Sequence, residues 1–136
     1  MKLSIQKKAN DYAIFNLALV PDESVMPASF SFQNNKCHTN SVAAFRSGRA
    51  DKVWLSLCSN GDYAFVHFIN SKDGKYFDET LHEHDHPWKH YIIRQVADSE
   101  MGEIGELLNI TQRSLLNMLA SPIEKFMHAI GLKEGV

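Results

Sequence analysis

The sequence predicts an α+β fold on three observations. Short apolar segments separated by turn signals fill residues 53–97, a helical pattern follows residue 104, and a short helical pattern begins at Cys37. With 136 residues, the chain has the usual size of one domain, and we expect a single domain over residues 1–136. Hydrophobic residues make up 44% and charged residues 22%, which indicates a soluble globular protein with one core.

Charge and cysteine content narrow the function classes. The formal net charge of -2 argues against a protein that binds nucleic acid mainly by neutralising phosphates. No apolar run is long enough to cross a bilayer, and the start of the chain lacks the apolar segment of a signal peptide. Cys37 and Cys58 are too few for a disulfide framework. We therefore expect a cytoplasmic protein with free thiols and no membrane partner.

The first third of the chain is expected to contain a helix or a strand, then a loop, then a short helix. Residues 1–20 fit either a helical stripe or, from residue 12, a buried strand, and a loop punctuated by prolines runs to about residue 35. Residues 37–46 then have the polar start and small residues of a short helix whose first turn lies near Cys37. Gly48 is a plausible stop for this helix, because glycine is favoured just past helix ends.

Four strands are expected next, in an antiparallel meander. Their predicted ranges are 53–58, 63–70, 75–81 and 90–97, with turns at residues 59–62 and 71–74. The second strand is apolar on both faces and should be covered on both sides. The tail from Ile104 to Ile130 is helical, with Ser121-Pro122 as the start of a further helix. Its Leu and Met stripes predict core packing or a subunit contact, which leaves a homo-oligomer open.

The meander places a histidine beside a carboxylate. If residues 71–74 form a four-residue loop, His67 lies directly opposite Asp78; if Asp73-Gly74 is a two-residue turn, Asp78 is a diagonal neighbour on the same face. A lone histidine in an apolar strand is usually a core residue. A carboxylate on the adjoining strand favours a functional role instead, because it can fix the tautomer and stabilise the imidazolium.

The expected nucleophile is Cys37. Unpaired N–H groups and the dipole at a helix start favour a thiolate, and a nearby imidazolium favours it further. Cys58 is the weaker candidate, because a cysteine in the middle of an apolar strand is expected to be buried and inert.

This order of residues resembles the papain-like and transglutaminase-like cysteine enzymes. Their pattern is a cysteine at a helix start, a histidine on a following strand and an acid on the next. Residues 67–80 resemble the His…Asp-Gly-Lys…Asp-x-Thr segment of these enzymes, and Cys37-His38-Thr39-Asn40 is similar to a Cys-His-x-Asn signature of small bacterial or phage proteins of this type. The resemblance covers about residues 33–81. Two features depart from it: no aromatic residue follows Cys37, and the gap from Gly74 to Asp78 is shorter than in transglutaminases.

The resemblance implies a fold in which an N-terminal helix carrying the cysteine packs on the meander, with C-terminal helices after it. It also implies acyl transfer at an amide or ester of a peptide, protein or small molecule, through a thioester on Cys37 and without a cofactor. Oxyanion donors would be the Cys37 backbone N–H and a side chain among Gln33, Asn34 and Asn35, with Gln33 preferred. His38 and Asn40 would support the helix.

Two alternatives stay open. One is a catalytically inactive member of the same fold that binds a protein partner. The other is a metal-binding protein organised around His82, His84 and His86, since His-x-His pairs beside a carboxylate can bind transition metals. A solvated loop between the third and fourth strands, or one that rims a cleft, explains the same residues.

Overall fold

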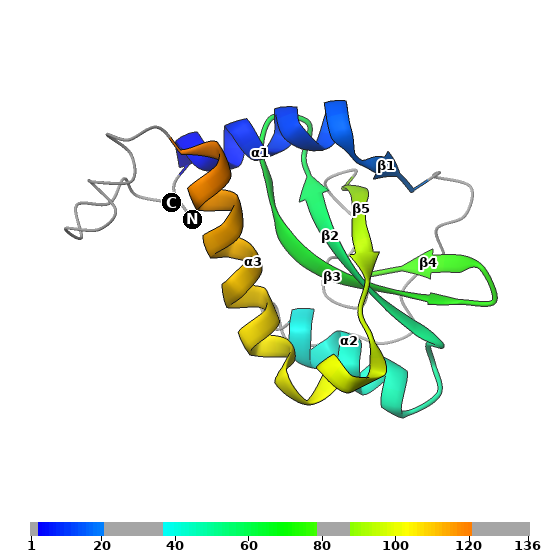
Figure 1. Cartoon of the computed structure of the whole chain (residues 1–136). Coiled ribbons are helices and arrows are strands. Elements are labelled where there is room, and N and C mark those ends of the chain that lie inside the picture. The colour runs from blue at the N-terminus through cyan, green and yellow to red at the C-terminus, as the bar shows by residue number, and fades with distance from the viewer. Residues whose placement is uncertain (1–2, 21–36, 79–87, 121–136) are drawn as a thin grey trace.

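The computed structural model describes residues 3–20, 37–78 and 88–120. Within these ranges the chain forms three α-helices, one 3-10 helix and a curled five-stranded antiparallel sheet, which confirms the α+β class (Figure 1). In chain order, the elements are α1 (Leu3–Asn16), β1 (Ala18–Leu19), α2 (Cys37–Arg46), β2 (Lys52–Ser59), β3 (Ala64–Lys72), β4 (Lys75–Phe77), β5 (Lys89–Gln95), η2 (Asp98–Glu103) and α3 (Ile104–Leu119).

The strand order corrects the expected meander. The sheet has the order β1-β5-β2-β3-β4, so β5 returns across the sheet to pair with β2 and does not pair with β4. Within the described residues β4 pairs only with residues 70–72 of β3. The edge of β3 before residue 70 is therefore not paired with β4, and α2 packs there. The expected third strand also ends earlier, at Phe77, while residues 79–81 lie outside the described ranges.

The β3–β4 turn selects one of the two registers expected from the sequence. Lys72 pairs with Lys75 and Asn70 with Phe77, which leaves Asp73 and Gly74 as a two-residue turn. Their φ angles of 52° and 79° are both positive. Asp and Gly are among the residues that adopt this backbone region most readily, and two positive φ angles match the right-handed twist of a tight hairpin.

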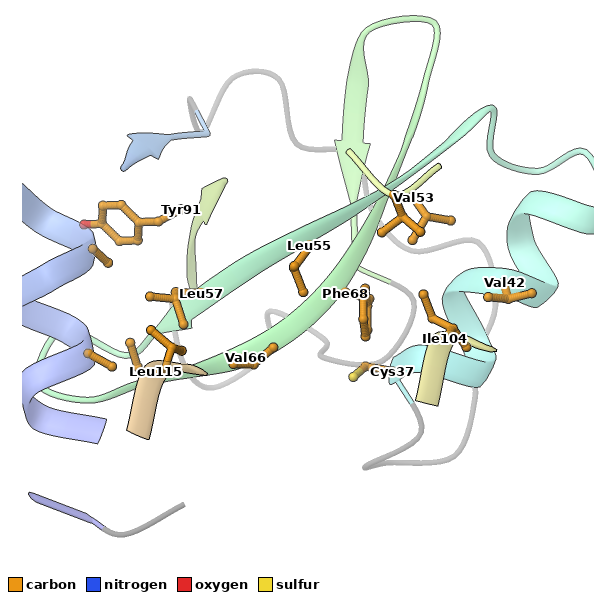
Figure 2. Packing of buried hydrophobic residues seen from close by; sticks show 14 of the residues in the cluster. Cys37, Val42, Val53, Leu55, Leu57, Val66, Phe68, Tyr91, Ile104 and Leu115 are labelled. Atoms are coloured by element: carbon orange, nitrogen blue, oxygen red, sulfur yellow. The ribbon is translucent and has the colours of Figure 1, made fainter. Parts of the chain in front are cut away.

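The hydrophobic core lies between one face of the sheet and the helices. Because side chains alternate along a strand, Leu55, Leu57, Val66 and Phe68 share a face, and they pack against residues from all three helices (Figure 2). In Figure 1, α3 runs between α1 and α2, and it contacts both. Ser56, Cys58 and His67 project from the opposite face of the sheet, whereas Cys37 on α2 belongs to the core cluster.

The helices near the two ends of the described chain can be compared with the elements expected there. Residues 3–16 are helical, so the strand reading from residue 12 to residue 20 is wrong apart from the two residues of β1. The helix that carries Cys37 is therefore the second one. On α3, Ile104 and Leu115 are buried as expected, whereas Met118 is 53% exposed. The helix expected after Ser121 lies outside the described residues, and no helix inside them is long and apolar enough for a membrane span.

Candidate functional site

Cys37 is the first residue of α2, as the sequence predicts. The helix extends from Cys37 to Arg46, and Gly48 follows with a φ of 82°, the left-handed conformation that commonly ends helices. Figure 2 shows the Cys37 side chain at the start of this helix, close to Phe68 in the same core cluster. The sulfur therefore lies at the positive end of the helix dipole, where a thiolate is favoured.

Two buried polar side chains fasten α2 to the edge of β3. The hydroxyl of Ser41 donates to the carbonyl of Phe68 at 3.2 Å. The amide of Asn70 donates to the carbonyl of Ser41 at 3.0 Å and to that of Lys52 at 3.2 Å. Both side chains are almost completely buried, so each bond forms away from water, and its loss would leave unsatisfied polar groups. These bonds fix where the first turn of α2 sits relative to β3.

His67 and Asp78 form a buried pair. Nε2 of His67 lies 2.7 Å from Oδ2 of Asp78, a hydrogen bond between a strand residue and the residue that follows β4. Burial would raise the pKa of Asp78, but the charge and hydrogen bond of His67, with a hydrogen bond from His90, hold it well below its ordinary value. Burial would likewise lower the pKa of His67, yet Asp78 and Cys37 raise it to about 10. The favoured charge state is thus a carboxylate beside an imidazolium.

The ring of His67 also hydrogen-bonds the sulfur of Cys37. Because Nε2 of His67 is directed at Asp78, Nδ1 is the ring nitrogen that remains for this contact. Burial by itself would raise the pKa of the Cys37 thiol, but the hydrogen bond and charge of His67, with a hydrogen bond from the Phe68 backbone, bring it below its ordinary value. The structure therefore brings together all three residues of the expected Cys–His–Asp site.

The two cysteines differ in the way expected from the sequence. Cys58 is fully buried in β2, and this burial together with the negative charge of Asp78 raises the pKa of its thiol well above the ordinary value. Cys37 retains 8% exposure and has a lowered pKa. Since the thiolate is the reactive form, Cys37 is the reactive candidate and Cys58 the inert one.

Two further polar residues lie near His67 and were not among the residues expected at the site. Nε2 of His90, on β5, lies 3.0 Å from the same Oδ2 of Asp78 that contacts His67. The hydroxyl of Ser56, on β2, donates to the carbonyl of His67 at 2.8 Å. The Ser56 contact belongs to the β2–β3 hairpin, whereas the His90 contact involves β5, which pairs with the other edge of β2.

The remaining sequence candidates divide into two groups. His38 and Asn40 lie on α2: Asn40 is buried, and His38 packs near Gly105 of α3, so His38 supports the helix by packing. Nδ1 of His38 is buried and has no hydrogen-bond partner within the described part of the chain. The other candidates lie outside the described residues: Gln33, Asn34, Asn35, His82, His84 and His86.

One group of described residues has metal-ligating atoms close together. One ligand atom each of Cys58, Asp78 and His90 lies within 4.8 Å of the other two, and all three residues are buried. A sulfur, an oxygen and an imidazole nitrogen suit zinc, but binding would require deprotonation of a thiol whose pKa is raised. The hydrogen bond between His90 and Asp78 already accounts for the closeness of two of these atoms.

Comparison of the chain with family models, with curated proteins and with solved structures gave no match. The chemistry of the site therefore rests on its own residues.

Proposed function

We propose that the protein is a cysteine-dependent hydrolase or acyltransferase of the papain-like or transglutaminase-like kind, acting on an amide or ester. The observation that carries this proposal is the continuous chain of contacts from the Cys37 sulfur through His67 to Asp78. A nucleophile, a base and a group that orients the base are the parts that nucleophilic catalysis requires. The two free cysteines are in keeping with a reducing compartment such as the cytoplasm.

In the first step, the thiolate of Cys37 attacks the carbonyl carbon of the substrate. Negative charge develops on the carbonyl oxygen of the tetrahedral intermediate. The first N–H groups of an α-helix have no partners within it, and α2 as described begins at Cys37, so its first N–H groups can donate to this oxygen. This is the same helix end that favours the thiolate, so one structural feature serves both charges.

In the second step, the intermediate collapses and His67 gives its Nδ1 proton to the leaving amine or alcohol. The products of this step are a thioester on Cys37 and a neutral imidazole. His67 then takes a proton from water or from an acceptor amine as that nucleophile attacks the thioester, and the C–S bond breaks to release the acyl product and restore the Cys37 thiolate beside the imidazolium. Asp78 remains ionised throughout and holds Nε2 of His67, which keeps the ring oriented towards the sulfur.

The test is acylation by an activated ester. Purified protein is mixed with p-nitrophenyl acetate, nitrophenolate release is followed, and peptide mapping locates the acetyl group. The expected result is a burst of nitrophenolate with acetyl-Cys37, absent in Cys37→Ala and strongly slowed in His67→Gln. The exposed turn variant Asp73→Asn is the matched control and should behave as the wild type. Acetylation of lysines alone, or equal bursts in wild type and Cys37→Ala, would refute the proposal.

A further inference from the structure

Asp78 holds two imidazoles on one oxygen atom. Its Oδ2 lies 2.7 Å from Nε2 of His67 and 3.0 Å from Nε2 of His90. A carboxylate only accepts hydrogen bonds, so both nitrogens must carry a proton and donate. The Cys–His–Asp arrangement needs one of these contacts, and the second is additional to it.

The pairing of β5 with β2 places the His90 side chain near this oxygen. His90 lies on β5 directly opposite Cys58 of β2, and His67 lies on β3 directly opposite Ser56. Positions 56 and 58 of β2 share a face, so both imidazoles project from the same side of the sheet. Their ring centroids are 6.3 Å apart, and the His90 side chain is 5% exposed. Asp78 lies between them as the residue that follows β4.

A buried carboxylate stays ionised only if donors replace the water that it has lost. In the proposed cycle His67 gives up and regains its Nδ1 proton. Its ring is therefore charged at some stages and neutral at others, and the strength of its hydrogen bond to Asp78 changes accordingly. A second donor that takes no part in the chemistry keeps the carboxylate fixed and charged at every stage. We propose that His90 is a positioning residue for the Cys37 site, whose Nε2–H holds Asp78 ionised and oriented towards His67.

This inference rests on the proposed function, because it assigns His90 to the same chain of contacts. The titratable groups that face His90 within the described residues are Asp78, His67 on β3 and Cys58 on β2. Cys37 on α2 is reached through His67. Any change that a His90 substitution causes in the pH response of Cys37 therefore has to act through Asp78, His67 or the thiol of Cys58.

The test measures the rate of Cys37 alkylation by iodoacetamide as a function of pH, with Cys37 quantified by peptide mapping. In His90→Gln the side-chain amide reaches about as far as Nε2 of histidine and can donate to Asp78. The amide in His90→Asn is too short to reach Asp78 in the same way, and His90→Leu has no donor. We expect the pH at which Cys37 reactivity falls on acidification to rise by about one unit in His90→Leu and His90→Asn, about tenfold in rate on that limb. His90→Gln should retain the wild-type profile.

If His90→Leu does not fold, the comparison of His90→Gln with His90→Asn carries the same information. Superimposable profiles for wild type, Gln and Asn, all folded by circular dichroism, would overturn the positioning role. So would one equivalent of zinc in the wild type that is lost in His90→Gln with a parallel loss of reactivity, because His90 would then be a metal ligand. A wild-type Cys37 that reacts as an ordinary thiol is a separate outcome, which defeats the proposed function itself.

Discussion

Nε2 of His67 lies 2.7 Å from Oδ2 of Asp78, and this single contact decides which nitrogen faces the cysteine. With Nε2 engaged, the ring presents Nδ1 to the Cys37 sulfur, and one imidazole links a thiol to a carboxylate across two strands and a helix. Asp78 therefore fixes the orientation of the His67 ring, which the proposed role of His67 as a base requires.

The first prediction concerns the pH dependence of the two thiols. Cys37 should react with iodoacetamide well below the ordinary thiol pKa of 9.0, because its own pKa is lowered by His67 and by the Phe68 backbone, against the opposing effect of burial. Cys58, with its raised pKa, should remain unmodified in the folded protein and react only after denaturation. Peptide mapping over a pH series reads both sites from one sample. Equal labelling of the two cysteines at every pH would contradict the assignment.

The second prediction removes the charge of Asp78. In Asp78→Asn, the pKa of His67 should fall, because burial lowers it and the opposing carboxylate is gone. A neutral imidazole no longer favours the thiolate, so alkylation of Cys37 near neutral pH should slow by at least about tenfold. Asp73→Asn is the matched control in the same hairpin, where an exposed carboxylate is neutralised at a positive φ that asparagine tolerates. A wild-type alkylation profile in Asp78→Asn would argue against the role of Asp78.

The third prediction loosens α2 from the sheet. Asn70→Ala removes the two hydrogen bonds from the Asn70 amide to the carbonyls of Ser41 and Lys52, which should lower the free energy of unfolding by about 2 kcal/mol. It should also reduce Cys37 alkylation at neutral pH, because the start of α2 is no longer held beside His67. Ser71→Ala loses a hydrogen bond from Trp54 on the same sheet without touching α2. This control should be destabilised without a change in Cys37 reactivity.

The fourth prediction concerns stability against pH, on a Cys37→Ser background so that no thiolate titrates at this site. His67 has its pKa raised above the ordinary 6.5, in part by Asp78, so its contribution is complete below 6.5 and is lost as the pH rises through its raised pKa. Urea unfolding should show a loss of about 1–2 kcal/mol from slightly acidic to mildly alkaline pH. The loss should be smaller when Asp78→Asn is added. An identical slope in both proteins would show that other groups cause it.

The sequence predicted local features of the site better than it predicted the sheet. The helix starting at Cys37 and the closeness of His67 to Asp78 follow from capping and turn patterns within short stretches of chain. The pairing of β5 with β2 joins residues from 30 apart (Ser59 with Lys89) to 41 apart (Trp54 with Gln95), and no turn signal specifies it. His90 was missed for this reason: its contact with Asp78 exists only because β5 lies on the far side of β2.

The final prediction tests the turn that sets the register of Asp78. Gly74→Ala places a Cβ at a φ of 79°, where the space is open but the backbone is strained, so the free energy of unfolding should fall by about 1 kcal/mol. Gly102→Ala is the matched control, because its site is equally open and has no positive φ. That variant should be neutral or slightly stabilised, since alanine restricts the unfolded chain more than glycine does. Because the strain acts three residues before Phe77 in β4, Gly74→Ala should also broaden or shift the pH profile of Cys37 alkylation, while Gly102→Ala should not. Equal stability changes in the two variants would mean that the two-residue turn is not formed. The β3–β4 register that brings Asp78 to His67 would then be wrong as well.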